Sequence, residues 1–262
     1  MKNICVITGA SSGIGKEIFL KLTTDKDMSF DEFWVIARSA DKLEGLKSLT
    51  ETPIKVIPLD LSMESAYEEY KALLDAEKPR IKLLVNCSGF GKFESSRRIG
   101  TEVSLNMIDL NVKATVAMDL HSVEYMEKGD GIINIASVAA YQPIPYINVY
   151  GATKSFVLNF TRALNVELRP KGIRVMAVCP FWTKTAFFDR AIKAEEDPVV
   201  KKYAAMYDPK DIAARAVRDY KKGKSVSLFG AVTKLQLLGV KLMPASMVMN
   251  VWMAQQKLKG RE

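Results

Sequence analysis

Short apolar segments rich in β-branched residues alternate along the chain with longer segments whose apolar residues recur at helical spacing. The seven predicted strands span 3–7, 33–37, 54–58, 83–86, 131–135, 173–178 and 225–229. The main predicted helices span 13–22, 41–49, 64–76, 103–126, 149–168 and 211–222. Continuous apolar strands that alternate with helices are typical of a parallel sheet buried on both faces. The pattern therefore predicts an α/β fold, a doubly wound seven-stranded parallel sheet.

The length of 262 residues would allow two small domains, but no repeat and no linker rich in Pro, Gly or Ser divides the chain. We therefore predict a single domain over residues 1–262. Residues 184–209 interrupt the alternation with mixed charge and helical pattern. They suit a flap over the substrate, and a plain surface insertion is the alternative.

Residues 230–262 form an apolar and basic C-terminal extension. Pro244 near a helix start precedes an apolar stripe made by Met247, Val248, Val251, Trp252 and Leu258. Three roles stay open: to cover the substrate side of its own subunit, to pack on a partner subunit, or to contact a membrane surface. We expect the first, and membrane contact is not favoured.

The composition is that of a packed globular protein, with 48% hydrophobic and 26% charged residues, and it excludes intrinsic disorder. The net charge of +8 is concentrated at one end, because residues 219–262 hold eight Lys or Arg and two acidic residues. Nucleic-acid binding is not expected, because aromatic residues suited to base stacking are not interleaved with these charges.

The three cysteines Cys5, Cys87 and Cys179 lie far apart in apolar segments, which is typical of buried thiols in a reducing compartment. With a single histidine, His121, we expect no metal site. The N-terminus lacks a signal-peptide core, and charged residues and a proline interrupt the apolar stretch 226–254. A cytoplasmic location is therefore expected.

The segment Thr8-Gly9-Ala10-Ser11-Ser12-Gly13-Ile14-Gly15 follows the first strand and leads directly into the first helix. A glycine turn in this position lets the backbone approach a pyrophosphate, which the amides and dipole of the following helix stabilise. The lysine after Gly15 is not followed by Ser or Thr, which disfavours a P-loop NTPase.

With this turn the sequence resembles the short-chain dehydrogenase/reductase family, and the resemblance covers about residues 3–220. Asp60-Leu61 resembles the adenine-contacting pair of the family, and Asn86-Cys87-Ser88-Gly89 resembles its Asn-Asn-Ala-Gly segment. Asn111, Ser137, Tyr150 and Lys154 follow in the order of the family's catalytic tetrad. The resemblance implies that the predicted sheet is of Rossmann type and that the activity is hydride transfer with a nicotinamide cofactor.

The chemistry of the tetrad follows from proton transfer to a carbonyl oxygen. Tyr150 is the expected acid, and Lys154 lies one helical turn away, where its charge can stabilise a phenolate. Ser137 is expected to hold the substrate oxygen. The resemblance assigns Asn111 to a water chain that leads to Lys154, and its spacing alone is equally compatible with a plain amide inside a helix.

The resemblance also implies a set of cofactor contacts. These are Gly9, Ser11, Ser12, Gly13, Ile14, Gly15, Arg38, Ser39, Asp60, Leu61, Asn86, Ser88, Gly89, Tyr150, Lys154, Pro180, Thr183 and Thr185. Two departures from the family pattern stand among them: Cys87-Ser88 replaces Asn-Ala, and Phe181 follows Pro180 where glycine is usual. Thr183 and Thr185 either contact the nicotinamide or cap a helix.

The end of the second strand selects the cofactor. It reads Val35-Ile36-Ala37-Arg38-Ser39 and has a basic residue where an acid would bind the free ribose hydroxyls. Arg38 can pair with a 2′-phosphate, so NADP(H) is the expected cofactor, although a solvated surface arginine would give the same pattern.

The sequence thus predicts an NADP(H)-dependent oxidoreductase that acts on a carbonyl or alcohol. A nucleotide-binding regulatory or scaffold protein without catalysis is the alternative. A hydrophobic substrate is expected from the aromatic residues around the site, which could equally be core: Phe90, Phe93, Tyr141, Tyr146, Phe181, Trp182, Phe187 and Phe188. A homodimer or homotetramer is expected.

Overall fold

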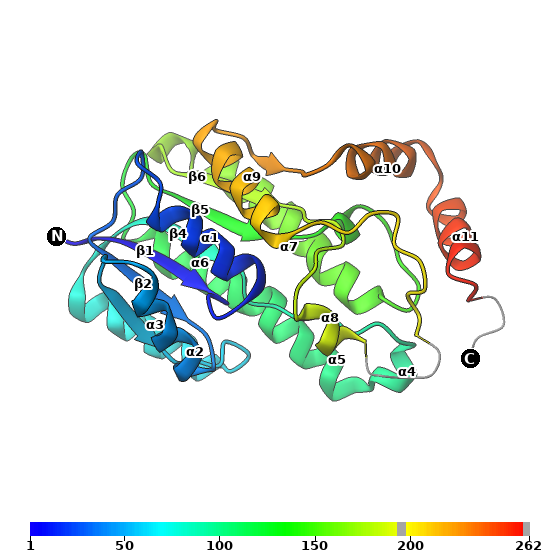
Figure 1. Ribbon diagram of the computed structural model, residues 1–262, viewed down its shortest axis with the longest axis horizontal. Coiled ribbons are helices and arrows are strands. Elements are labelled where there is room, and N and C mark those ends of the chain that lie inside the picture. The colour runs from blue at the N-terminus through cyan, green and yellow to red at the C-terminus, as the bar shows by residue number, and fades with distance from the viewer. Residues whose placement is uncertain (193–197, 259–262) are drawn as a thin grey trace.

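The computed structural model describes residues 1–192 and 198–258, and it contains one twisted parallel sheet (Figure 1). The strands are β1 Asn3–Thr8, β2 Glu32–Ile36, β3 Ile54–Ile57, β4 Arg80–Asn86, β5 Gly131–Ile135, β6 Arg174–Val178 and β7 Val226–Ser227. Their order is β3-β2-β1-β4-β5-β6-β7, with every neighbouring pair parallel. The predicted fold class, a single Rossmann-type α/β domain, is confirmed.

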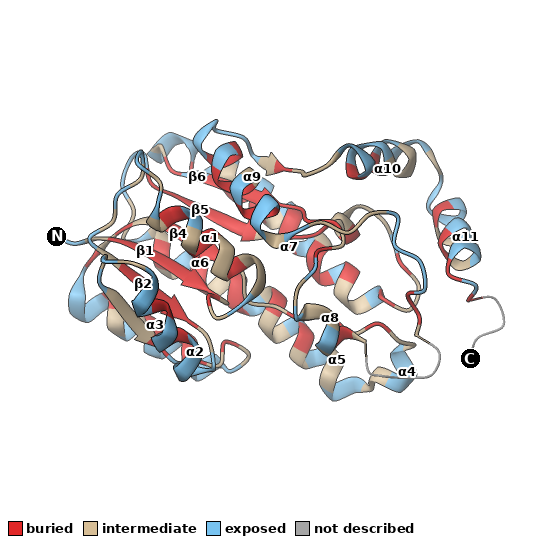
Figure 2. Cartoon of the chain, in the orientation of Figure 1, coloured by how far each residue is buried: buried red, intermediate tan, exposed pale blue. Residues whose placement is uncertain are grey.

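Helices cover both faces of the sheet (Figure 1). On one face pack α1 Gly13–Thr23, α2 Ala40–Glu44 and α9 Pro209–Lys221. On the other face pack α3 Glu64–Glu77, α6 Ala114–Val123 and α7 Asn148–Glu167. In β1, Ile4 and Val6 pack against the face covered by α3, α6 and α7. Cys5 and Ile7 pack against the face covered by α1, α2 and α9. Figure 2 shows the central strands as mostly buried. Because alternate side chains point to opposite faces, a strand covered on both sides must be apolar throughout.

The predicted helix 103–126 is divided into three parts in the structure. α5 Thr101–Ile108 runs into a π-helical turn, Asp109–Lys113, before α6 begins. Such a turn contains an extra residue and shifts the helix face, and here it buries the polar Asn111. The last strand is shorter than predicted, because the chain leaves the sheet after Ser227 toward Gly230, whose φ is +89°.

The regular spacing of Phe156, Phe160, Leu164 and Leu168 on α7 predicts a single face packed on the sheet. Leu164 and Leu168 are buried, but Phe156 is 44% exposed. Four residues exceed one helical turn by about 40°, so a four-residue repeat drifts around the helix. The prediction was therefore wrong for Phe156.

The predicted flap, 184–209, contains α8 Phe187–Ala191 and a bridge between Thr183 and Tyr207. Residues 193–197 of the flap lie outside the described residues. The C-terminal extension forms α10 Ala231–Leu242 and α11 Ala245–Gln255, and α11 begins directly after Pro244 as expected. Within the described residues, the helices are too short or too polar to cross a membrane.

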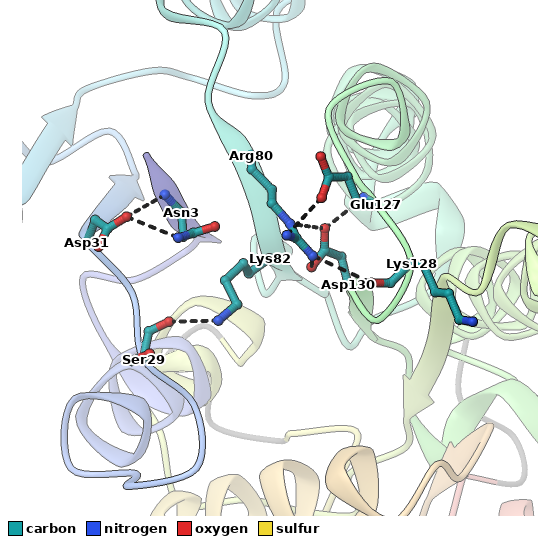
Figure 3. Close-up of polar contacts among 8 residues, drawn as sticks. All are labelled: Asn3, Ser29, Asp31, Arg80, Lys82, Glu127, Lys128 and Asp130. Atoms are coloured by element: carbon teal, nitrogen blue, oxygen red, sulfur yellow. Dashed lines mark hydrogen bonds and ion pairs between the residues drawn. The ribbon is translucent and has the colours of Figure 1, made fainter. Parts of the chain in front are cut away.

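A polar cluster stabilises the amino ends of the central strands, the edge opposite the candidate site (Figure 3). Arg80 at the start of β4 donates two hydrogen bonds to the buried carboxylate of Asp130, at 2.9 and 3.0 Å, and pairs with Glu127. The backbone amide of Asn3 donates to Asp31 at 2.7 Å. The first pair aligns β4 with β5, and the second aligns β1 with β2.

Candidate functional site

A cavity of about 600 Å³ lies at the carboxyl ends of the strands, the usual ligand position in a doubly wound sheet. Every site residue predicted from the sequence lines it, apart from Asn86 and Asn111. Residues from 9 to 256 contribute to its walls, so the fold brings distant segments together at this edge.

The glycine turn needs its glycines for conformation and for space. Gly9 and Gly13 have φ values of +65° and +56°, in the left-handed region that side chains disfavour. A Cβ on Gly15 would lie 2.4 Å from the carbonyl oxygen of Gly9. The backbone of this turn can therefore approach a bound group closely.

The first turn of α1 offers unpaired amides to the cavity. Its N-cap residue, Ser12, makes no side-chain cap hydrogen bond, and no acidic residue lies in the first turn. Ser11, Gly13 and Ile14 line the cavity at this point. Free amides and the positive end of the helix dipole make this a site for an anion such as a pyrophosphate.

Thr8 fixes the neighbouring loop after β4. Its hydroxyl oxygen accepts hydrogen bonds from the amides of Cys87 and Ser88, both at 3.1 Å. A Cβ on Gly9 would lie 2.8 Å from the amide nitrogen of Ser88. The two loops are therefore held as a pair beside α1.

Tyr150, Lys154 and Ser137 lie together in the cavity. Lys154 Nζ lies 5.9 Å from the centroid of the Tyr150 ring, and Ser137 lies near enough to lower the pKa of the tyrosine. Burial raises the pKa of Tyr150 to about 12 and outweighs the opposite effect of Ser137. A tyrosine with a pKa in this range remains protonated at neutral pH.

Lys154 is a buried cation on α7. Its Nζ donates to the carbonyl oxygen of Ile135 at 2.7 Å, and the side chain is 6% exposed. Burial lowers the pKa of Lys154 to about 8, because desolvation disfavours the charged form. The ammonium group is therefore still present at neutral pH beside Tyr150.

Asn111 does not line the cavity but forms hydrogen bonds with two segments beside it. Its amide nitrogen donates to the carbonyl oxygen of Phe90 at 2.9 Å and to the hydroxyl of Thr153 at 3.0 Å, and its oxygen accepts from the amide of Phe90. These bonds connect the loop after β4 with the residue before Lys154. Asn111 thus has the geometry of a positioning residue, and its predicted water chain stays a prediction.

Asn86 points away from the cavity, unlike the cofactor contact expected of it. Its amide donates to Asp119 at 2.7 Å and to Asn134 at 2.9 Å, in a buried network. Asn134 also donates to Asp119, and burial raises the pKa of that carboxyl to about 8 despite these bonds. The side chain of Asn86 therefore connects β4 with β5 and with α6.

Three charged side chains meet at the end of the cavity near β2. Arg38 lies 3.8 Å from the carboxylate of Asp60, and Arg190 of α8 interacts electrostatically with both. Burial acts to raise the pKa of Asp60, but hydrogen bonds from Ser62 and the charge of Arg38 lower it below its ordinary value. Asp60 is therefore an anion, and Arg38 and Arg190 together leave an excess of positive charge.

Thr183 and Thr185 line the cavity from the loop after β6. Thr183 donates to the carbonyl oxygen of Phe181 at 2.8 Å, and Thr185 accepts from the amide of Phe187 at the start of α8. The hydroxyl of Thr185 therefore makes a local contact just before α8, whose N-cap residue is Ala186.

The wall beside Tyr150 is aromatic. Phe93 lies 6.2 Å from Tyr150 and 6.0 Å from Trp182, between ring centroids. The predicted lining is present for Phe90, Phe93, Phe181, Trp182, Phe187 and Phe188, but it was wrong for Tyr141 and Tyr146, which do not line the cavity. The hydroxyl of Tyr141 instead accepts a hydrogen bond from Arg162 on the outer side of α7. The C-terminal helices complete the wall with Val248 and Trp252.

Sequence reasoning missed three features of the site. A Cβ on Gly91 would lie 2.9 Å from the ring of Tyr150, so glycine is needed beside the tyrosine. The guanidinium of Arg190 stacks 3.9 Å from the ring centroid of Phe90. Gln256 accepts from the amides of Lys201 and Lys202 and connects the chain after α11 to the flap. Only Gly91, close to Gly89, carried a local signal.

The thiols and the histidine lie apart from this chemistry. Burial raises the pKa of Cys5 and Cys179, which are both buried, and the half-buried Cys87 has a pKa raised to about 12. Among residues 1–192 and 198–258, no group of His, Cys, Asp and Glu side chains could hold a metal ion. His121 lies half-buried on α6.

Comparisons with known proteins agree with this architecture. Residues 3–196 match the family model for short chain dehydrogenase. An uncharacterized oxidoreductase of Staphylococcus epidermidis is 31% identical over 182 residues, which cover 68% of this chain and 77% of that protein. Mouse 17-beta-hydroxysteroid dehydrogenase type 3 is 33% identical over 188 residues, or 69% of this chain and 60% of that protein.

A solved structure extends the match to nearly the whole fold. A short-chain dehydrogenase from Sphingobium yanoikuyae in complex with NADPH superposes with a TM-score of 0.75 at 24% identity. The match covers 92% of this chain and 94% of that one. The extent of the family model and the identity to the staphylococcal oxidoreductase place the sequence among these enzymes. The chain belongs to the short-chain dehydrogenase family of oxidoreductases.

Proposed function

We propose that this protein is an NADP(H)-dependent oxidoreductase that interconverts a hydrophobic carbonyl compound and its alcohol. The observation that carries the proposal is the arrangement of Tyr150. Its side chain lies with Ser137 in the same cavity as the glycine turn, and the ammonium nitrogen of Lys154 lies 5.9 Å from the centroid of its ring. This is the geometry that general acid–base catalysis at a carbonyl oxygen requires.

The residues present fit a dinucleotide. The uncapped amides of α1 and the glycines beside them would hold the pyrophosphate, and Asp60 and Leu61 would contact the adenine side. The proposed contacts at the nicotinamide end are Lys154, Pro180 and Thr183. When bound, the nicotinamide supplies or accepts the hydride.

Tyr150 would donate its proton to the substrate oxygen during reduction and recover it during oxidation. Ser137 would hold that oxygen by a hydrogen bond. The ammonium group of Lys154 would stabilise the phenolate, because an opposite charge nearby lowers the free energy of the charged form. Asn111 would keep the loop of Phe90 and the helix of Lys154 in register.

The preference for NADP(H) is proposed from charge. Solved structures of this fold contain NADPH in one case and NADH in another, so the fold alone does not select the cofactor. Arg38 at the end of β2 and Arg190 on α8 would pair with a 2′-phosphate, and Ser39 would add a hydroxyl donor. A dinucleotide without that phosphate would leave one carboxylate, Asp60, to balance the two arginines.

The substrate class is proposed from the aromatic wall. Phe93, Trp182, Phe187 and Phe188 offer apolar surface and few polar partners, which favours a bulky ketone over a sugar. The similarity to a mouse hydroxysteroid dehydrogenase supports the same class. We also propose a cytoplasmic location and a homo-oligomeric state for this enzyme.

The test is the oxidation of NADPH with a panel of apolar ketones. Tyr150→Phe removes the transferable proton, and kcat should fall by about 10²- to 10⁴-fold with little change in the Kd for NADPH. Lys154→Ala should weaken both kcat and NADPH binding. In the native protein the rate of reduction should fall as pH rises through about 8, the pKa of Lys154.

Tyr141→Phe is the matched control, because Tyr141 is nearby but does not line the cavity, and its kcat should stay unchanged. Retained kcat in Tyr150→Phe would remove the tyrosine from the acid role. A native protein that binds NADPH but oxidises it with none of the ketones would favour the regulatory or scaffold alternative.

A further inference from the structure

Helices α10 and α11, called here the C-terminal arm (residues 231–255), form the end of the molecule farthest from the N-terminus (Figure 1). The arm is anchored on its inner side. Thr233 and Leu237 of α10 are buried, and Trp252 of α11 donates to the carbonyl oxygen of Pro145 at 3.0 Å. The arm is therefore an ordered part of the protein surface.

The outer side of the arm exposes large apolar side chains. On α10, Leu235, Leu238 and Leu242 are 72%, 55% and 77% exposed, and their spacing places them on one helix face. On α11, Met247 is 51% exposed, whereas Val251 lines the cavity. Figure 2 shows the outer surface of both helices as mainly exposed. Single exposed leucines are ordinary, but a row along two consecutive helices indicates a binding surface.

The charge on the arm has one sign. Lys234 and Lys241 are exposed, lie seven residues apart along the edge of the leucine face, and form no ion pair with a carboxylate among the described residues. Between residues 220 and 258 the sequence contains no Asp or Glu. The surface therefore combines exposed leucines with unneutralised lysines.

We propose that the outer face of the C-terminal arm binds an anionic membrane surface. A second copy of the chain is a poorer partner, because a two-fold contact through this face would bring lysines together without any acid from the arm to pair with them. An anionic bilayer supplies both the apolar environment for Leu235, Leu238 and Leu242 and the negative charge for the lysines.

The inner side of the same helices lines the cavity. Gln236, Val240 and Met243 from α10 and its end, with Val248 and Trp252 from α11, are part of its wall. Docking through the outer face therefore places this side of the cavity next to the lipid. This step rests on the proposed function: an enzyme docked in this way would take a ketone dissolved in the membrane as its substrate.

The test is sedimentation of the full-length protein with vesicles, without cofactor or substrate, so that its result is independent of the proposed activity. The protein should pellet with vesicles of phosphatidylcholine and phosphatidylglycerol, and less with phosphatidylcholine alone or at high salt. Lys234→Ala with Lys241→Ala should weaken binding by about 25-fold, or about fivefold per lysine.

Leu242→Glu should weaken vesicle binding by about tenfold or more. Leu49→Glu is the matched control, because Leu49 is also exposed, at 44%, but lies outside the arm, and it should bind like the native protein. Thermal unfolding verifies that all variants are folded. Native protein that stays in the supernatant with anionic vesicles would overturn the proposal, as would equal loss in both leucine variants. A lower oligomeric state in Leu242→Glu would assign the face to a second copy instead.

Discussion

Arg38 is the single residue on which the proposed choice of cofactor depends most. It lies 3.8 Å from Asp60, so a 2′-phosphate would compete with this carboxylate for the guanidinium. Arg190, which interacts electrostatically with both side chains, keeps the local charge positive in the presence of Asp60. The proposed preference for NADPH therefore depends on Arg38 and Arg190 in the presence of Asp60, and Arg38 is the nearest of the three to the end of β2.

Arg38→Asp is expected to narrow or reverse the preference for NADPH over NADH. A charge-assisted hydrogen bond contributes about 1.5–3 kcal/mol, or roughly 10- to 150-fold in the ratio of affinities. The measurement is KM for both cofactors. Arg97→Asp on α4 (Ser96–Ile99), an exposed arginine outside the cavity, is the control. Equal KM values for both cofactors in the native enzyme would contradict the prediction.

Asp119 makes stability depend on pH. Burial raises the pKa of this carboxyl to about 8 in the folded state, above its ordinary value near 4 in the unfolded chain. Folding then favours the protonated form, so the contribution of Asp119 to stability is greatest below about pH 4 and is lost as pH rises toward 8. Carboxyls with a lowered pKa, such as Asp219 and Asp60, change stability at a lower pH than Asp119 does. Lys154 changes it at a pH above about 8.

The free energy of unfolding should therefore fall between pH 5 and 8, with a slope of at most about 1.4 kcal/mol per pH unit. Asp119→Asn has no titrating group and should flatten this slope, whatever its effect on absolute stability. Urea unfolding of the native protein and of the variant at several pH values measures the two slopes. If the variant keeps the slope of the native protein, Asp119 is not its source.

At the scale of elements, the carboxyl ends and the amino ends of the strands have different roles. The carboxyl ends of the strands form the cavity, and the amino ends are held by the polar cluster of Figure 3. Arg80 opens β4 and pairs with Asp130, which directly precedes β5, so one side chain aligns two neighbouring strands. This cluster is expected to contribute to stability and not to catalysis.

Arg80→Met should lower the free energy of unfolding by about 1.5–3 kcal/mol, because the buried Asp130 loses its charged partner. Its kcat should stay native at a temperature where the variant is folded. Lys82→Met is the milder control, since Lys82 donates to an exposed carbonyl, that of Ser29, and lies 5.9 Å from the ring centroid of Phe30. Chemical denaturation measures both, and equal losses would contradict a specific role for the Arg80–Asp130 pair.

At the scale of the whole molecule, exposed apolar side chains remain on α5, α6 and α7. They are Leu105, Ile108, Leu120, Phe156 and Val166. α5 and α7 contact one another, and Phe156 stacks on Phe160 with the ring planes 17° apart. An apolar surface of this kind on helices that carry site residues is suited to a subunit interface.

The native protein is therefore expected to be a homodimer or homotetramer by light scattering. Phe156→Glu with Leu105→Glu should lower the oligomeric state, because the interface would bury two charges without partners. Leu242→Glu, on the C-terminal arm, should leave it unchanged. A monomeric native protein would show that these side chains have another role.

What the sequence by itself determined is local in origin. Strands buried on both faces are apolar throughout, so the sequence predicts them directly. The left-handed φ of Gly9 and Gly13 requires glycine, so the glycine turn after β1 was also predictable. Tyr150 and Lys154 share a helix face because of their four-residue spacing. The order of these elements was then sufficient to predict the sheet and the position of the site at its carboxyl edge.

The tertiary structure decided whatever depends on a distant partner. Asn86 and Asp119 lie 33 residues apart, and only packing makes them a hydrogen-bonded pair that turns Asn86 from the cavity. The π-helical turn at Asn111, the place of Arg190 over Phe90, and the split of the C-terminal arm into a cavity face and an exposed face also depend on such contacts. Periodicity describes one helix at a time, and the surfaces that meet it are defined only when the chain has folded.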